Sequence, residues 1–219
     1  MTALDPDSAP SLDDLTTTDI VELGERYGLV PQELDGETPL RELVRSEDPS
    51  TATREGVHWI VRRRPQGAAS HVARHGILDP EATTAADLPA ADHEAIRDLD
   101  AEALSEGVLA GKWNVFCTPE EVDDRWRRVR ALFDEDVVFS AKVSTKWGRE
   151  AKGQDTHVIV VYTPNYFDTD DVFRVRDSLR TRCGIDATLY YKPDLWTTKG
   201  IYGATAAEFG LPRASRYAG

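Results

Sequence analysis

Short runs in which hydrophobic and polar residues alternate, or in which β-branched residues are concentrated, predict the strands of this chain. They occur at residues 57–63, 111–117, 137–145, 157–163 and 186–191. In the second run, alternation puts Trp113 on one strand face and Lys112 on the other. In the third run, Lys142 shares a face with Ser140 and Ser144. The expected sheet therefore carries lysines on its surface.

Apolar residues at helical spacing predict two helices among these strands. The first starts at a capping-box pattern, Thr118-Pro119-Glu120-Glu121. Its apolar stripe consists of Val122, Trp126, Val129 and Phe133. Its outer face carries three acid-to-arginine pairs: Glu121–Arg125, Asp123–Arg127 and Asp124–Arg128. Such pairs indicate a salt-bridged surface rather than an RNA-binding one. The second helix is expected from about residue 168 to residue 183, before a C-cap at Gly184.

The order of these elements is strand, helix, strand, strand, helix, strand. This order is typical of an α+β fold, in which helices cover one face of an antiparallel sheet. We expect residues 51–219 to form this domain, with the motif core at 111–202. Residues 1–50 form an acidic N-terminal extension with two short amphipathic helices expected within 12–48. Because that segment carries no chemical motif, docking onto a protein partner is the role we consider for it.

Acidic residues dominate the composition and limit the classes of partner. The chain has 39 Asp and Glu against 26 Lys and Arg, a net charge of −13. A dense carboxylate surface with few lysines suggests a salt-adapted, halophilic cytosol, and the alternative is an ordinary acidic protein. Binding to duplex DNA is not expected, because phosphate recognition needs a basic surface. A short anionic ligand remains compatible with the near-neutral second half.

No apolar run approaches the length of about 18 residues that a membrane span needs. The N-terminal residues are acidic and unlike a signal peptide, so we expect a cytoplasmic protein without membrane contact. Cys117 and Cys183 are far apart and have no histidine or cysteine at metal-ligand spacing. We therefore expect two buried thiols, with no metal, disulfide or cofactor.

The distribution of lysine directs attention to the second half of the chain. All six lysines lie there, and residues 1–110 contain none. Lysines that are retained against such a bias are candidates for a function, although the composition of strands and loops is an alternative explanation. Phosphate-binding Walker loops are absent, as are GxGxxG, GxSxG and HExxH motifs. These absences exclude P-loop nucleotidases, dinucleotide enzymes, α/β-hydrolases and zincins.

Lysines beside aromatic residues on a sheet predict a site for an aromatic, phosphorylated ligand. Its phosphates would bind ammonium groups and its ring would stack on Trp113 or Tyr202. The ligand-binding candidates are Lys192, Arg176, Arg180, Trp113, Ser144, Thr145, Asp194 and Tyr202. The arginines have an internal alternative, because Asp177 is three residues before Arg180.

Four motifs, GKWNVFC, AKVST, HVIVVYT and YYKPDLWTTKGIY, follow one another between residues 111 and 202. In this order and spacing they resemble the protein family first named from basophilic leukaemia cells. The resemblance implies a fold like that of the cap-binding translation initiation factor of the 4E type, with a curved antiparallel sheet and helices on its convex side. The leading hypothesis is that a small phosphorylated ligand, a nucleotide or RNA end, binds in the concave face.

Archaeal and bacterial members of that family are labelled phosphothreonine lyase domain proteins, which gives a second hypothesis. Eliminating phosphate needs a base for the α-proton, an acid for the leaving oxygen and arginines for the phosphate, for which Arg176 and Arg180 are the candidates. The base candidates are Lys142, Lys112 and Lys192, provided that burial lowers the pKa of the lysine. His157 is the acid candidate, and its alternative is an ordinary polar residue at a strand start. A third hypothesis is an interaction module without a small ligand.

Overall fold

The computed structural model describes residues 48–219, with the exception of 54 and 64–66. The two helices expected between residues 12 and 48 thus lie outside the described residues. The chain divides into two compact units. In the described residues, the first unit comprises 48–63 without 54, together with Phe116–Phe133 and Ser140–Ile159. The second unit comprises 67–115, Asp134–Phe139 and Val160–Gly219.

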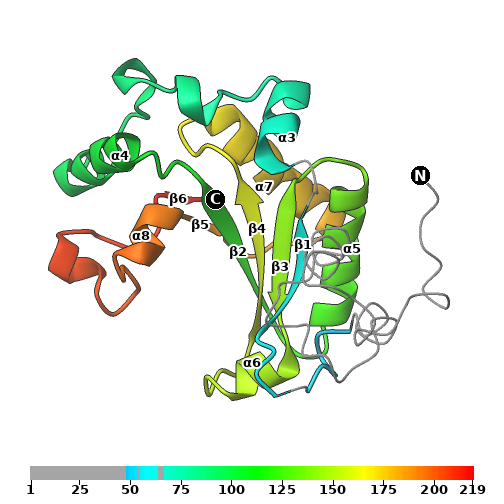
Figure 1. Ribbon diagram of the computed structural model, residues 1–219. Helices are drawn as coiled ribbons and strands as arrows, with labels where there is room; N and C mark the ends of the chain where they lie inside the picture. Colours follow the sequence, from blue (N-terminus) through cyan, green and yellow to red (C-terminus); the bar gives the residue numbers. More distant parts are fainter. Residues whose placement is uncertain (1–47, 54, 64–66) are drawn as a thin grey trace, which may run out of the picture. The chain divides into compact units, whose positions relative to one another are not determined.

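The strands are labelled in Figure 1 and form a six-stranded sheet in the order β1-β3-β4-β2-β5-β6. Their bounds are β1 Trp59–Arg63, β2 Gly111–Cys117, β3 Ser140–Ser144, β4 His157–Thr163, β5 Tyr190–Pro193 and β6 Tyr217–Ala218. The pairs β1–β3, β2–β5 and β5–β6 are antiparallel. The expected α+β class with a curved antiparallel sheet is confirmed.

The α-helices of the described residues are α3 Gly67–His75, α4 Glu94–Glu106, α5 Val122–Asp134, α6 Lys146–Glu150, α7 Thr169–Cys183 and α8 Asp194–Thr198. The short 3-10 helices are η4 Pro80–Ala82, η5 Ala85–Asp87 and η6 Ala206–Phe209. Helix α7 matches the second expected helix, and Gly184 adopts the left-handed C-cap conformation with φ of 67°.

Helix α6 lies between the strands expected at residues 137–145 and 157–163, where no helix is predicted. Thr145 is its N-cap, and the threonine hydroxyl accepts a hydrogen bond from the Gly148 amide at 2.9 Å. A Cβ atom on Gly148 would lie 2.5 Å from the carbonyl oxygen of His58. The helix is therefore packed closely on the backbone before β1, and this contact is not visible in the local sequence.

In the first unit, β1 and β3 pair so that Trp59 faces Ser144 and Val61 faces Lys142.

Helix α5 follows its capping pattern, with the Thr118 amide donating to Glu121 at 3.0 Å. Its buried stripe consists of Val122, Trp126, Val129 and Leu132. Leu132 thus takes the buried place that the periodicity assigned to the neighbouring Phe133.

Two of the expected ion pairs on α5 are confirmed, and one is wrong. Arg125 pairs with Glu121 at 2.7 Å and Arg128 with Asp124 at 2.9 Å. The expected Asp123–Arg127 pair is replaced by a second contact to the Asp124 carboxylate, with Arg127 at 3.0 Å. The Asp123 carboxylate instead accepts hydrogen bonds from the amide and hydroxyl of Ser50 at 3.0 and 2.5 Å.

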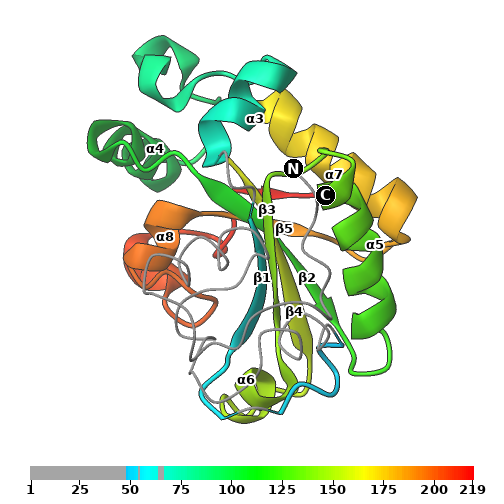
Figure 2. The same ribbon diagram turned by 45° about the vertical axis from the view of Figure 1, so that its right-hand side comes forward.

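In the second unit, α7 packs on the face of β2 that carries Trp113. Both elements are labelled in Figure 2. The Trp113 indole is fully buried, and its N–H donates to the carbonyl oxygen of Val172 in α7 at 2.9 Å. The Tyr191 ring lies 5.2 Å away in an edge-on contact, and the Tyr191 hydroxyl bonds Thr163 at 2.6 Å. A satisfied aromatic core therefore occupies this face.

A buried ion pair attaches the C-terminal segment to α4. The Arg216 guanidinium donates to the Asp100 carboxylate at 3.0 Å, and the Tyr166 hydroxyl donates to the same carboxylate at 2.9 Å. Arg216 also donates to the carbonyl oxygens of Pro89 and Ala90. The charges are thus compensated by hydrogen bonds on several sides, as a buried pair requires.

Candidate ligand-binding site

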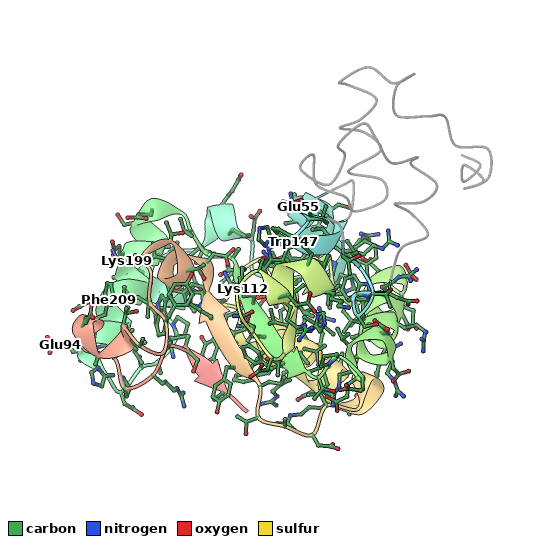
Figure 3. The ribbon with its side chains drawn as sticks, turned by 90° about the horizontal axis from the view of Figure 1, so that it is seen from below. Glu55, Glu94, Lys112, Trp147, Lys199 and Phe209 are labelled. Atoms are coloured by element: carbon green, nitrogen blue, oxygen red, sulfur yellow. The ribbon has the colours of Figure 1, made fainter. Side chains whose placement is uncertain are left out.

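Lys112 and Lys192 are direct cross-strand partners on β2 and β5. Strand alternation places both on the face opposite Trp113 and its partner Tyr191. Figure 3 labels the Lys112 side chain on β2. Two ammonium groups that are far apart in the sequence are therefore neighbours on one face of the second unit.

Lys112 has an acidic partner inside the second unit. Its Nζ forms an ion pair with the carboxylate of Asp194, the first residue of α8. The same Nζ lies 5.8 Å from the ring centroid of Tyr162 on β4, a cation–π contact. Asp194 is positioned by its amide, which donates to the Ala110 carbonyl at 2.9 Å just before β2.

Lys192 has a different environment. Only 8% of the residue is exposed, and Nζ lies 3.7 Å from the ring centroid of Tyr202. Among the described residues, no carboxylate lies within ion-pair distance of this ammonium group. Burial, and then the positive charge of Lys112, lower the pKa of Lys192 to about 8. The lysine is therefore held as a poorly compensated cation.

Tyr202 offers an aromatic surface next to this cation. The ring is 54% exposed, although the preceding Ile201 is fully buried. The Tyr202 amide donates to the Thr205 hydroxyl at 2.8 Å, and that hydroxyl donates to the Gly200 carbonyl at 2.7 Å. The turn thus fixes the backbone on both sides of Tyr202. We call Lys112, Lys192, Asp194, Tyr162 and Tyr202 the lysine–tyrosine site.

Arg176 and Arg180 do not join the lysine–tyrosine site. Both lie on α7, which packs on the opposite face of β2. Arg176 pairs with Asp177 at 2.7 Å and lies 4.6 Å from the centroid of the Phe173 ring. The internal pairing considered for Asp177 therefore involves Arg176. Trp113 is also unsuited to stacking on a ligand, because both α7 and Tyr191 cover it.

The remaining candidates lie in the first unit. Lys142 Nζ is 4.4 Å from the centroid of the Trp59 ring, and Lys152 Nζ is 5.0 Å from it. Thr145 is fully buried as the cap of α6. The Ser144 hydroxyl accepts a hydrogen bond from the Val158 amide at 3.0 Å. Ser144 and Thr145 thus have local structural contacts.

His157 is fully buried at the start of β4. Its Nδ1 lies 2.7 Å from the Ser144 carbonyl oxygen and donates to it, since a carbonyl can only accept. Burial lowers the pKa of the imidazole, so the ring is neutral at pH 7. This environment matches the structural alternative for His157 better than the role of a catalytic acid.

Tyr162 is a member of the lysine–tyrosine site that the sequence reasoning missed. Its strand was predicted, and period-two alternation separates it from the inward-facing Val161 and Thr163. That signal gave the face of the strand but not its neighbours.

In the part of the chain that the structure describes, no helix is long and apolar enough to cross a membrane.

Solved structures similar to this chain include complexes of eIF4E. One is C. elegans eIF4E-3 with the 4E-binding protein Mextli and a cap analogue, at 17% identity and a TM-score of 0.37. That match covers 42% of this chain and only 55% of the C. elegans chain. Another is Schistosome eIF4E with m7GpppG and 4E-BP, at 12% identity and a TM-score of 0.37, over 68% of this chain and 79% of that chain.

One family model matches the sequence over residues 68–200, and the family is described as basophilic leukemia-expressed protein Bles03. The match covers more than half of the 219 residues. It includes β2 and β5, the two strands that carry the paired lysines. The resemblance seen in the sequence motifs is thereby confirmed, and the chain belongs to the Bles03 family.

Proposed function

We propose that the lysine–tyrosine site binds a small phosphorylated ligand, specifically a nucleotide or a phosphorylated RNA end. The ammonium groups of Lys192 and Lys112 would hold the phosphates, and the exposed face of Tyr202 would stack on the base. The Asp194 carboxylate would accept hydrogen bonds from amino or hydroxyl groups of the ligand.

The observation that carries this proposal is the environment of Lys192. An ammonium group is costly to bury unless an anion or acceptor compensates it. Lys112 next to it has the Asp194 carboxylate, whereas Lys192 has only the Tyr202 ring among the described residues. A ligand phosphate would supply the missing negative charge. The adjacent exposed ring favours a ligand with an aromatic base over inorganic phosphate alone.

Isothermal titration calorimetry with GTP, a 5′-phosphorylated oligoribonucleotide and tripolyphosphate tests the proposal. Replacing Lys192 with Ala should weaken the binding of all three ligands by about tenfold to a hundredfold. This is the range expected for losing a hydrogen bond to a charged group. Tyr202→Leu should weaken the binding of the two nucleotide ligands and leave the affinity for tripolyphosphate unchanged. The matched control is Lys199→Ala, because Lys199 pairs with Glu102 at 2.5 Å.

Equal affinities for wild type and Lys192→Ala would contradict the proposal. So would an equal loss on Lys199→Ala, because that would indicate a diffuse charge effect. Absence of binding by all three ligands would favour the interaction-module hypothesis. That hypothesis involves residues 12–48, and capture of a protein partner that depends on this segment would support it.

A phosphothreonine lyase-like activity is the second candidate, and the pKa of Lys192 favours it. With a pKa of about 8, roughly a tenth of this lysine is neutral at pH 7. The neutral amine would take the α-proton of phosphothreonine while the Cβ–O bond breaks and phosphate leaves, which forms dehydrobutyrine. Mass spectrometry of a phosphothreonine peptide measures this product. If the Lys192→Ala variant still forms dehydrobutyrine, Lys192 is excluded as the base.

A further inference from the structure

Two histidines of α3 and one aspartate converge in the second unit. His71 and His75 are one helical turn apart, and Asp136 lies in the segment before β3. His71 Nδ1 is 3.3 Å from Asp136 Oδ1, and His75 Nε2 is 3.3 Å from Asp136 Oδ2. The three ligand atoms all lie within 4.8 Å of one another.

These distances resemble the spacing of ligands around a zinc ion. Ligand bonds of about 2.0–2.1 Å in a tetrahedron put neighbouring ligand atoms about 3.3 Å apart. Charge-assisted hydrogen bonds are usually shorter, at about 2.7–2.9 Å. The two histidines contact different oxygens of Asp136, and both contacts are longer than strong charge-assisted hydrogen bonds, so the three groups lie close enough to share one ion. Two imidazoles and a carboxylate are also a common ligand set for zinc and neighbouring divalent ions.

The three side chains are held in place before any ion binds. His71 is 1% exposed, and its ring packs 5.8 Å from the ring of Phe139. Asp136 has a φ of 63°, the one positive value among the described non-glycine residues. This left-handed conformation is uncommon outside glycine, and Asp adopts it more often than most residues, typically in turns.

We propose that His71, His75 and Asp136 form a binding site for a divalent transition-metal ion of the zinc type. These residues supply three ligands, and water would take the fourth position. The site opens to solvent at His75 and Asp136, whose side chains are 31% and 21% exposed. This inference uses a different part of the second unit and does not depend on the lysine–tyrosine site.

Arg74 is the competitor for this carboxylate. Its guanidinium contacts both oxygens of Asp136, at 3.1 and 3.3 Å. The Arg74 side chain is 49% exposed, so it can turn into solvent when a cation arrives. If Asp136 serves only as the ion-pair partner of Arg74, the substitution Arg74→Gln should not strengthen metal binding. A metal site predicts that the same substitution strengthens binding, because it removes a competing positive charge.

Titration of the full chain with Co²⁺, followed by visible absorption and calorimetry, tests the inference. We expect one ion per chain and a visible spectrum without a thiolate charge-transfer band. His75→Gln should weaken binding by about a hundredfold, since even an outer-sphere partner is worth 10- to 100-fold. Arg74→Gln should tighten it severalfold. His75 is suited to this test because, unlike His71, its side chain is partly exposed.

His93→Gln is the matched control, because His93 lies at the N-cap of α4 and outside the cluster. Circular dichroism of each variant checks that the fold is retained. The proposal is overturned if no stoichiometric ion binds, if His75→Gln binds as the wild type does, or if a thiolate band shows that cysteines bind the cobalt.

Discussion

Lys112 and Lys192 face each other across β2 and β5, yet only Lys112 has a carboxylate partner, Asp194, among the described residues. The two lysines therefore have different electrostatic environments on one sheet face. Lys112 is compensated within the protein. Lys192 has a lowered pKa and an aromatic neighbour, which is the arrangement expected of a lysine that binds an anionic ligand.

The pH dependence of ligand binding should follow the charge of Lys192. Its pKa is lowered to about 8, so the ammonium group loses its proton between pH 7 and pH 9. Affinity for a phosphorylated ligand should therefore fall by about tenfold over this interval, measured by calorimetry in buffers of constant ionic strength. Lys192→Arg retains its charge and should have a flat profile. A wild-type profile that is equally flat would contradict the assignment.

Without ligand, Lys192 should lower the stability of the protein. A folded-state pKa below the unfolded value of 10.5 means that the unfolded chain binds more protons between pH 8 and pH 10. The free energy of unfolding should thus rise with pH over this interval. Lys192→Met should raise it at pH 7 by about 1–3 kcal/mol, measured by urea unfolding. Lys199→Met, which breaks the partly buried pair with Glu102, should not stabilise the protein.

Gly111 should not tolerate a side chain. A Cβ atom built at this position lies 2.3 Å from the hydroxyl oxygen of Tyr191, which is fully buried. Gly111→Ala should therefore lower the free energy of unfolding by about 1–3 kcal/mol through overpacking, measured by thermal or urea unfolding. Gly203→Ala is the control, since nothing lies within 4 Å of a Cβ there. Equal effects of the two substitutions would argue against the close packing of β2 and β5.

The Asp100–Arg216 pair should be essential for stability. Both side chains are almost fully buried, at 1% and 6% exposure, so either single substitution leaves a charge without a partner. Asp100→Asn or Arg216→Met should each cost about 3–5 kcal/mol, and the double variant should cost less than the sum. The exposed Arg127, which pairs with Asp124, provides a control whose loss should change stability by under about 1 kcal/mol.

Local patterns in the sequence predicted five of the six strands, helices α5 and α7, and the strand faces that carry Lys112 and Trp113, but not helix α6 or the burial of Leu132 in place of Phe133. Alternation separated Lys112 from Trp113, and the structure buries only the tryptophan fully. The capping pattern before α5 and Gly184 after α7 also marked helix ends correctly. These signals are local because backbone geometry alone fixes the period of a strand or a helix. The family resemblance rested on similar short motifs.

The expectation of no metal considered only the surroundings of the two cysteines. The spacing of His71 and His75 was a usable signal, because residues four apart share a helix face. Their partner Asp136 is more than sixty residues away, however, and no local pattern connects it to them. The candidate metal site therefore became visible only in the folded chain.

The sequence by itself determined five of the strands, helices α5 and α7, and the alternation of faces along the strands. Only the tertiary structure decided that Lys112 meets Lys192, that Trp113 lies beneath α7, and that the arginines of α7 belong to the other face. The reason is physical. Residue periodicity follows from the local backbone, whereas the pairing of strands eighty residues apart depends on how all the apolar faces are buried together.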